Sequence, residues 1–368
     1  MYINSKNKKR VSVKTVLFLL TLLIVLAVFI TGIVMLLTKG KDLKDTLEEM
    51  PFSSRDPYFA AGGNIVYMDG SVMTCADTSV SDVWKAELSS SDFEYTTNGS
   101  LIAAVGQDVI MMFGTGGENL FSTRINGTIS SVRLGKDKIA ITADQRLSDK
   151  TLSYIVIFDK SGNSIFRLDD ISGKYVLDYG FDAEGRQFYL LELDVSGTAP
   201  VSRITTYRPD TESMTGIKEL KDQLVSKIYI GEEAIYTMGT NRLSQYSSLN
   251  SSAKDVLVYG WVLEDICTQT PPSFVYVRSS ESLYFDTARL ITASGAETKV
   301  NLPPGVFKIL HSGEKIYCFA SGSIFVYTGD GGYLRSYELP FEIDGAKRAM
   351  NGHAFITAGD KVYLMPLP

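Results

Sequence analysis

The sequence is poor in the residues from which metal and catalytic sites are most often built. Its 368 residues include only two histidines, His311 and His353, and three cysteines, Cys75, Cys267 and Cys318, that lie far apart. An odd number of cysteines without CxxC spacing argues against a disulfide framework and against a zinc site. We therefore predict three buried cysteines, two histidines with turn or surface roles, and no bound metal.

Motifs of several enzyme classes are also missing. There is no HExxH helix, no GxSxG elbow, no glycine-rich phosphate loop and no EF-hand calcium loop. The formal net charge of -6, from 42 acidic and 36 basic residues, provides no clustered basic face for nucleic acid. We therefore expect no catalytic residue, no cofactor and no nucleic-acid partner.

One long apolar run is present. Val16 to Leu37 contains 22 residues without a charge, which as a helix spans roughly 33 Å, the thickness of a bilayer core. A cleaved signal peptide has a shorter apolar stretch that ends at small residues, and a lipoprotein anchor needs a cysteine after the run. Neither feature occurs here, so the sequence predicts an uncleaved transmembrane helix over residues 15–38.

The charges on either side of this run predict its orientation. Five basic residues precede the run (Lys6, Lys8, Lys9, Arg10, Lys14) and three follow it (Lys39, Lys41, Lys44). The excess favours a short cytoplasmic tail at 1–14, so the bulk of the chain is expected outside the cell membrane. Residues 39–51 then form either a short helical stalk, with an apolar spacing that ends at Pro51, or a charged linker.

The remainder of the chain has an all-β pattern with an internal repeat. From Phe52 onward, short runs rich in Tyr, Phe, Val and Ile alternate with Gly, Asp, Asn and Ser. A turn followed by an apolar strand recurs about every 41 residues, a period typical of β-propeller blades. The copies begin at Gly63, Gly99, Gly135, Gly185, Gly231, Gly313 and Gly352, with a degenerate copy at Pro272.

Each repeat contains the elements of a four-stranded blade. In the best copies an aromatic residue precedes a turn glycine by four and an apolar residue follows it by three, so that the two are expected to face each other across a hairpin. These sets are Phe113/Gly117/Leu120, Phe158/Gly162/Ile165 and Tyr327/Gly331/Leu334. Further strands between units, such as 225–230 and 306–310, complete four.

We therefore predict a propeller over residues 52–368. Eight blades are favoured, or seven if one weak copy is spurious, and residues 52–61 are expected to supply a strand missing from the last copy and so lock the ring. An open array of hairpins and a pair of β-sandwiches are the alternative folds.

The connections between the second and third strands of each blade should share one face. They are minimal in blades 1, 2, 7 and 8 but longer and polar in blades 3 to 6, at residues 142–151, 193–202, 238–246 and 278–282. Three of these connections carry an arginine: Arg146, Arg242 and Arg278. Converging arginines can hold a carboxylate, a phosphate or an acidic loop, whereas arginines that never meet are merely solvated.

The layout of the chain resembles two groups of proteins. The Asp-x-x-Gly turns and blades of about 40 residues are similar to those of quinoprotein-like propellers, including bacterial ones that scaffold envelope assembly. The basic tail, single span and Tyr-rich propeller together resemble an uncharacterised membrane-anchored propeller family of Gram-positive bacteria. The blade tryptophans that would dock a quinone are missing, since only Trp84 and Trp261 occur.

These features predict a noncatalytic binding or scaffolding propeller at the cell envelope, with protein partners. One alternative is an extracytoplasmic sensor of a small anion or wall fragment. Another is a hydrolase or lyase, which would require two carboxylates that converge in an axial pocket with shifted pKa values.

Overall fold

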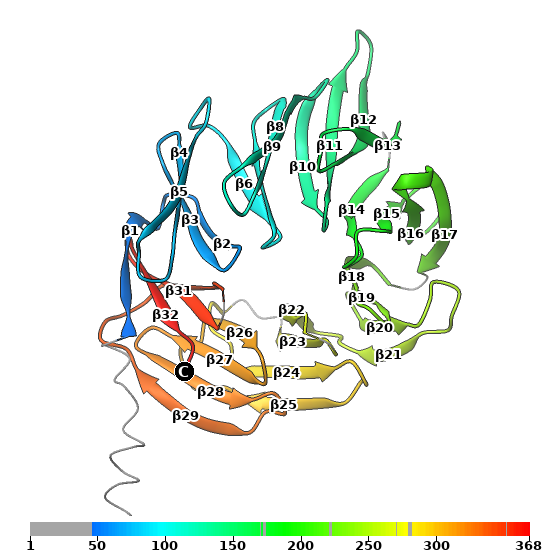
Figure 1. The fold of residues 1–368 in the computed structure, drawn as a ribbon. Coiled ribbons are helices and arrows are strands. Elements are labelled where there is room, and N and C mark those ends of the chain that lie inside the picture. The colour runs from blue at the N-terminus through cyan, green and yellow to red at the C-terminus, as the bar shows by residue number, and fades with distance from the viewer. Residues whose placement is uncertain are drawn as a thin grey trace, which may run out of the picture. The chain divides into compact units, whose positions relative to one another are not determined.

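The computed structural model describes residues 46–368 except 170, 172–173, 221–222, 270, 279–281 and 351. The chain divides into two units, Met1–Thr46 and Leu47–Pro368. The second unit consists of eight four-stranded antiparallel sheets arranged in a ring (Figure 1). The predicted eight-bladed β-propeller is thereby confirmed.

The first four blades follow one another along the chain. Blade 1 contains β2 (Tyr58–Ala61), β3 (Asn64–Asp69), β4 (Val72–Ala76) and β5 (Asp82–Glu87). Blade 2 contains β6 (Glu94–Thr97), β7 (Leu101–Val105), β8 (Val109–Gly114) and β9 (Asn119–Arg124). Blade 3 contains β10 (Thr128–Leu134), β11 (Lys138–Arg146), β12 (Thr151–Asp159) and β13 (Ser164–Leu168). Blade 4 contains β14 (Tyr175–Phe181), β15 (Phe188–Asp194), β16 (Val201–Arg208) and β17 (Ser213–Leu220), with a 3-10 turn, η2, at Pro209–Thr211.

The last four blades complete the ring. Blade 5 contains β18 (Val225–Ile230), β19 (Ile235–Gly239), β20 (Arg242–Tyr246) and β21 (Lys254–Leu257). Blade 6 contains β22 (Trp261–Cys267), β23 (Ser273–Arg278), β24 (Thr287–Thr292) and β25 (Glu297–Asn301). Blade 7 contains β26 (Lys308–Ser312), β27 (Lys315–Ala320), β28 (Ser323–Thr328) and β29 (Tyr333–Glu338). Blade 8 contains β30 (Gly345–Arg348), β31 (His353–Ala358), β32 (Lys361–Pro366) and, from the other end of the chain, β1 (Glu48–Ser53).

The core lies between blades rather than within them. The second and third strands of each blade carry runs of apolar residues whose side chains alternate between the two faces of the sheet, so each blade is apolar on both sides. One buried cluster, for example, joins Ile110 and Met112 of blade 2 to Ile139 and Val156 of blade 3. A blade alone would leave both faces in water, and this is the physical reason why the sequence repeats.

Turn glycines make a second contact between neighbouring blades. Gly162, in the β12–β13 turn, has a φ of 82°, and a Cβ added there would lie 2.9 Å from Phe121 on the outer strand of the preceding blade. A Cβ added at Gly117 would likewise lie too close to Trp84, and one added at Gly331 would lie too close to Val300. These glycines therefore meet two requirements, a positive φ and close approach to a neighbouring blade.

The predicted pairing across these hairpins is wrong by one residue. Phe113 pairs with Asn119, Phe158 with Ser164 and Tyr327 with Tyr333, because each hairpin has a register shift at this position. The apolar residue that was expected opposite the aromatic ring is instead the extra residue of a β-bulge.

The ring is closed by the N-terminal strand, which lies earlier than expected. β1 pairs with β32 and forms the outer strand of blade 8, and Met50 and Phe52 on it are buried. The propeller therefore begins before residue 52, and Glu48–Met50 form strand rather than helix. Residues 58–61, which were also considered for closure, form the innermost strand of blade 1.

The predicted transmembrane span at 15–38 lies outside the described residues, as do the tail at 1–14 and residues 39–45 of the stalk. Within the part of the chain that the structure describes, no helix is long and apolar enough to cross a membrane.

The ring has two distinct faces. The connections between second and third strands lie beside the links between blades, as shown by the 2.9 Å hydrogen bond from the Thr240 N–H to the Leu224 carbonyl. We call this side the loop face. The opposite side, the turn face, carries the remaining turns, and the chain reaches the propeller there because Glu48 pairs with Leu364 near the end of β32.

Candidate functional site

The axial channel is lined by the innermost strands of the eight blades, and three ion pairs on these strands join residues that are distant in the sequence. Asp265 follows a register shift in β22. Its carboxylate accepts a hydrogen bond of 2.7 Å from the backbone N–H of His311 on β26 and one of 2.6 Å from Arg348 on β30. Three consecutive inner strands are thus held by one carboxylate.

Arg348 reaches across blade 7 to make this contact. Its Nη2 atom also donates to the carbonyl of His311 at 2.7 Å, so the Arg348 guanidinium contacts both β26 and, through Asp265, β22. The His311 side chain is buried, and its Nδ1 atom lies 3.0 Å from the Ser273 hydroxyl. Burial lowers the pKa of His311 below its usual range. The predicted surface role of His311 is therefore wrong, because the residue lies in an inner strand.

A second carboxylate occupies the corresponding place in blade 4. Asp178 also follows a register shift, and its side chain accepts hydrogen bonds from the backbone N–H groups of Ile228 at 3.1 Å and Tyr179 at 3.0 Å. Arg133 of blade 3 lies 4.0 Å from it. Burial raises the pKa of the Asp178 carboxyl above its usual range, although these partners oppose the shift.

These contacts determine what the channel can do chemically. Lys308 and Glu264 form a further pair between blades at 2.8 Å. Asp178, Asp265 and Glu264 are each held by a neighbouring blade, which leaves them poorly placed to exchange protons with a substrate. Among the described residues, no group of three His, Cys, Asp or Glu side chains is placed to hold a metal ion.

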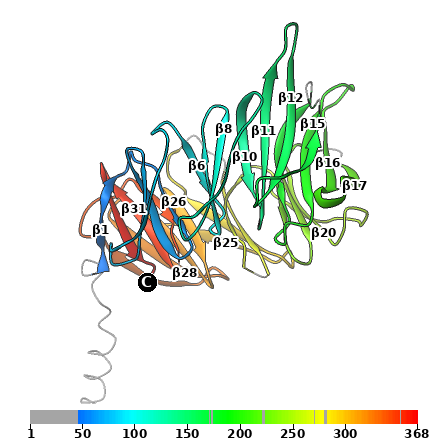
Figure 2. The ribbon, with the colours of Figure 1, turned by 45° about the horizontal axis from the view of Figure 1, so that its top comes forward.

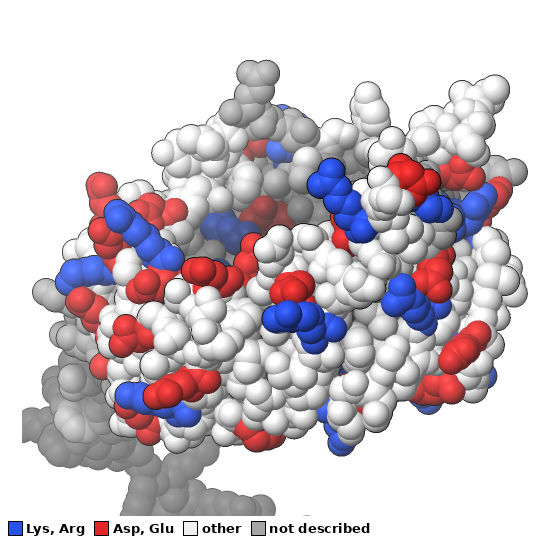
Figure 3. Space-filling view, turned by 90° about the horizontal axis from the view of Figure 1, so that it is seen from above, with Lys and Arg blue, Asp and Glu red and all other residues white. Residues whose placement is uncertain are grey.

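Two hollows beside the channel are open to solvent and lined by charged side chains of both signs. One, of about 500 Å³, lies between β6 and β10, and another, of about 530 Å³, between β18 and β22. Figure 3 shows acidic and basic side chains interspersed over the rim of the ring, with no area of a single sign on the side it presents. Neither feature selects a strongly charged ligand.

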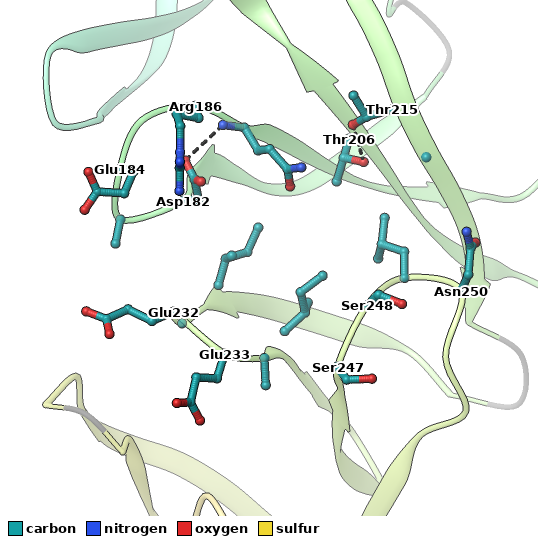
Figure 4. Close-up of a pocket in the computed structure, with 18 residues that line it drawn as sticks. Asp182, Glu184, Arg186, Thr206, Thr215, Glu232, Glu233, Ser247, Ser248 and Asn250 are labelled. Carbon is teal, nitrogen blue, oxygen red and sulfur yellow. Dashed lines mark hydrogen bonds between the residues drawn. The ribbon is translucent and has the colours of Figure 1, made fainter.

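A pocket of about 460 Å³ opens on the turn face between blades 4 and 5 (Figure 4). Asp182, Glu184, Glu232 and Glu233 lie at its edge, and Arg186 is the one basic residue that lines it. The Asp182 carboxylate accepts the backbone N–H of Gln187 at 2.9 Å, which makes it part of the turn. Glu184 pairs with Lys136 at 2.7 Å outside the pocket. The pocket floor is built from backbone, isoleucine and small polar side chains.

The three predicted arginines lie on the loop face of three blades. Arg146 ends β11, Arg242 begins β20 and Arg278 ends β23. Arg242 pairs with Asp255 at 3.2 Å and Arg278 lies 3.9 Å from Asp286, in each case within its own blade. Arg146 is exposed, and no ion pair joins it to the described residues. The three arginines, on blades 3, 5 and 6, therefore share no ion-pair partner within the described part of the chain.

Two of the four expected long connections, those of blades 3 and 5, are corrected by the structure, whereas those of blades 4 and 6 are present. Residues 142–146 continue β11, and the β11–β12 hairpin projects beyond the other blades (Figure 2). In blade 5 only Thr240 and Asn241 join β19 to β20, a connection as short as those of blades 1, 7 and 8. In blades 4 and 6 the strands are joined by residues 195–200 and 279–286, of which 279–281 lie outside the described residues.

Sequence reasoning missed the channel carboxylates Asp178 and Asp265. The available signal was an acidic residue inside an apolar inner strand, in "YVLDYGF" (175–181) and "WVLEDIC" (261–267). The cysteines, in contrast, were predicted correctly, since Cys75, Cys267 and Cys318 are all buried and unpaired.

Comparison with solved structures supports the propeller fold. The chain is similar to BamB from Moraxella catarrhalis, with 10% identity and a TM-score of 0.51 over 84% of this chain and 96% of that one. It is similar to the computationally designed Ika8 protein, with 12% identity and a TM-score of 0.55 over 89% and 100% of the two chains. It is also similar to the WD40 domain of SCAP from fission yeast, with 8% identity and a TM-score of 0.52 over 87% and 98%. At such identities the likeness shows the fold alone.

Comparison of the sequence itself points to a family. No curated protein sequence matches the chain. The model of DUF5711, which is described as a family of unknown function, matches residues 41–295. Since this match covers well over half of the sequence, the chain belongs to the DUF5711 family.

Proposed function

We propose that this chain is a noncatalytic binding or scaffolding propeller, anchored in the cell membrane by residues 15–38 and exposed outside the cell. The uncharged run Val16–Leu37, with more basic residues before it than after it, supports the anchor and its orientation. The resemblance of the whole layout to a membrane-anchored, quinoprotein-like propeller family of Gram-positive bacteria is consistent with this role.

One observation favours binding over catalysis: three carboxylates of the channel, Asp178, Asp265 and Glu264, are bonded to neighbouring blades. Asp265 holds β26 and β30, and Asp178 holds β18. A glycosidase-like mechanism needs one carboxyl group that keeps a proton and a second that is free to act on substrate or water. Asp178 has the raised pKa of the first, but its oxygens accept backbone N–H groups.

The anion-sensor alternative receives less support. Arg242 and Arg278 are partly neutralised by carboxylates of their own blades, so an incoming anion would have to displace Asp255 or Asp286. A rigid ring with accessible loops is, in contrast, a suitable scaffold for a protein partner.

Cysteine labelling in cells tests the anchored topology. The three native cysteines are buried, and burial raises the pKa of Cys75 to about 11 and that of Cys318 to about 12, so the background is expected to be low. A Ser91→Cys variant places a thiol on the exposed propeller surface. We expect a membrane-impermeant maleimide to label it in intact cells, and an alkaline carbonate wash to leave the protein in the membrane.

The matched control is Ser5→Cys in the predicted cytoplasmic tail. It should be labelled only after the cells are permeabilised. If Ser91→Cys also requires permeabilisation, or if the wash releases the protein, the anchored extracytoplasmic role is wrong.

A further inference from the structure

The exposed apolar side chains are concentrated on the loop face. Fourteen large apolar side chains of the described residues are exposed, and five of them lie on the outer strands of three blades: Val83, Met214, Ile217, Tyr333 and Leu334. The other nine lie on the loop face of blades 3 to 6: Leu147, Tyr175, Val195, Leu224, Leu257, Tyr259, Val262, Leu283 and Tyr284. We call these nine residues the apolar arc.

The arc offers an area that matches a protein interface. Tyr259 is 85% exposed, Leu283 83% and Leu257 70%. At such fractions each side chain exposes on the order of 100 Å², so nine side chains offer several hundred square ångströms of apolar surface, comparable with the roughly 800 Å² that one partner contributes to a standard interface. Exposed apolar side chains concentrated on one face in this way are more informative than ones scattered singly over the surface.

The charges beside the arc are largely neutralised by the propeller itself. Arg203 contacts Asp194 at 3.1 Å and Glu219 at 3.2 Å, and Lys174 contacts Glu192 at 3.0 Å. Arg242 is paired in the same way within its blade. Arg146, exposed beside Leu147 without an ion pair among the described residues, is the exception. With most of its charges paired, this surface complements a partner whose own surface is apolar and carries little charge.

The point at which the chain reaches the propeller argues against a second copy as the occupant. Glu48 lies on the turn face, and residues 38–47, which can extend at most about 35 Å, connect it to the predicted span. Two propellers stacked through their loop faces would carry these connections at opposite ends of the dimer, so a stack that stands upright on one membrane could not anchor both copies. This step rests on the proposed membrane anchor.

We propose that the apolar arc is the docking surface for a different protein, one that presents an apolar, weakly charged surface outside the membrane. The aromatic and leucine side chains of the arc provide the anchors of such an interface, and the paired arginines Arg203 and Arg242 form part of its polar rim.

Photocrosslinking of the full chain in membranes of cells that make it tests this proposal. The photoreactive residue p-benzoylphenylalanine replaces Tyr259, Leu283 or, as a control on the outer strand β29, Tyr333. We expect one and the same second protein to be crosslinked from positions 259 and 283 and not from 333.

Binding between the two purified proteins then provides the quantitative test. The Tyr259→Ser/Leu283→Ser double variant of the full chain should bind the crosslinked protein at least tenfold more weakly, since aromatic and large apolar anchors dominate interfaces. The matched Tyr333→Ser/Leu334→Ser double variant should change the affinity less than twofold.

Several results would overturn the proposal. They are adducts between two copies of this chain, adducts with lipid, equal adducts from position 333, no adduct at all, and an unchanged affinity of the arc variant. The carbonate wash and the maleimide labelling test the membrane anchor. The dependence of crosslinking on position tests the apolar arc, so failure of the anchor and failure of the arc can be told apart.

Discussion

The contact between turn glycines and the preceding blade gives the sharpest prediction for stability. Gly162 has a φ of 82°, a region that costs a residue with a side chain roughly 1–2 kcal/mol. A Cβ at this position would also lie 2.9 Å from the Cβ and Cγ atoms of Phe121, and such overpacking costs about 1–3 kcal/mol more. We therefore expect Gly162→Ala to lower the free energy of unfolding by about 2–5 kcal/mol.

Two other glycines separate these contributions. Gly99 has a φ of 88° and open space around its added Cβ, so Gly99→Ala should cost only the roughly 1–2 kcal/mol of backbone strain. Gly322 has neither a positive φ nor a neighbour within 4 Å, so its substitution by alanine should be neutral or slightly stabilising. Urea titrations of the purified full-length chain measure the three differences on one scale.

A double-mutant cycle identifies the neighbouring blade as the cause. In a Phe121→Ala background the ring is gone but the Phe121 Cβ contact at 2.9 Å remains, so Gly162→Ala should cost less than in the natural sequence but still more than Gly99→Ala does. The coupling energy is expected to be at least about 0.5 kcal/mol. If Gly162→Ala costs the same with and without the Phe121 ring, contact of the turn glycine with the preceding blade does not contribute to the cost.

Three further predictions concern closure, the channel and pH. Removing residues 47–53 leaves β32 as an open edge, and size-exclusion chromatography should show loss of the monomer to aggregates. Arg348→Met should lower the free energy of unfolding by about 1–2 kcal/mol because Asp265 loses its partner, whereas the exposed pair of Lys361 should contribute less than about 0.5 kcal/mol when Lys361→Met is measured in the same urea titration. Burial lowers the folded-state pKa of His311, so the unfolded state binds the proton more readily below pH about 6.5. Stability should therefore be constant just above that pH and fall as the pH drops from about 6.5 toward the folded-state pKa, and His311→Asn should remove this part of the pH profile.

The architecture was predictable because the repeat is local. Each turn glycine and the strand after it lie within about ten residues, so the spacing can be read without knowledge of distant contacts. The starts at Gly63 and Gly352 directly precede β3 and β31, and the strand expected at 225–230 is β18. The closing strand was predicted too late in the chain because Glu48–Met50 were interpreted as the end of a helical stalk or a charged linker. Only pairing with β32, more than 300 residues away, makes these residues a strand.

The loop expected in blade 3 was predicted wrongly for a related reason, whereas the long connections expected in blades 4 and 6 are present. Residues 142–151 are polar and read as a connection, yet most of them extend β11 and β12. Within this hairpin the Ser153 hydroxyl donates to the Asp144 carboxylate at 2.5 Å, so polar side chains satisfy one another across the two strands. Polarity alone does not distinguish a loop from a projecting hairpin. A hairpin tip in water has no buried face, so its strands lack the alternation of apolar and polar residues that would identify them.

The channel residues could not be paired from the sequence, since Asp265 is 46 residues from His311 and 83 from Arg348. Their arrangement has a consequence for function. A carboxylate that holds two neighbouring blades makes the inner ring rigid, and its negative charge is balanced by the groups that it binds there. The loop face remains accessible, and there apolar side chains are exposed while Arg242 and Arg278 are paired within their blades. Paired charges at the centre and exposed apolar side chains on the loop face fit the proposed scaffold that holds a protein better than an enzyme that draws a substrate into its channel.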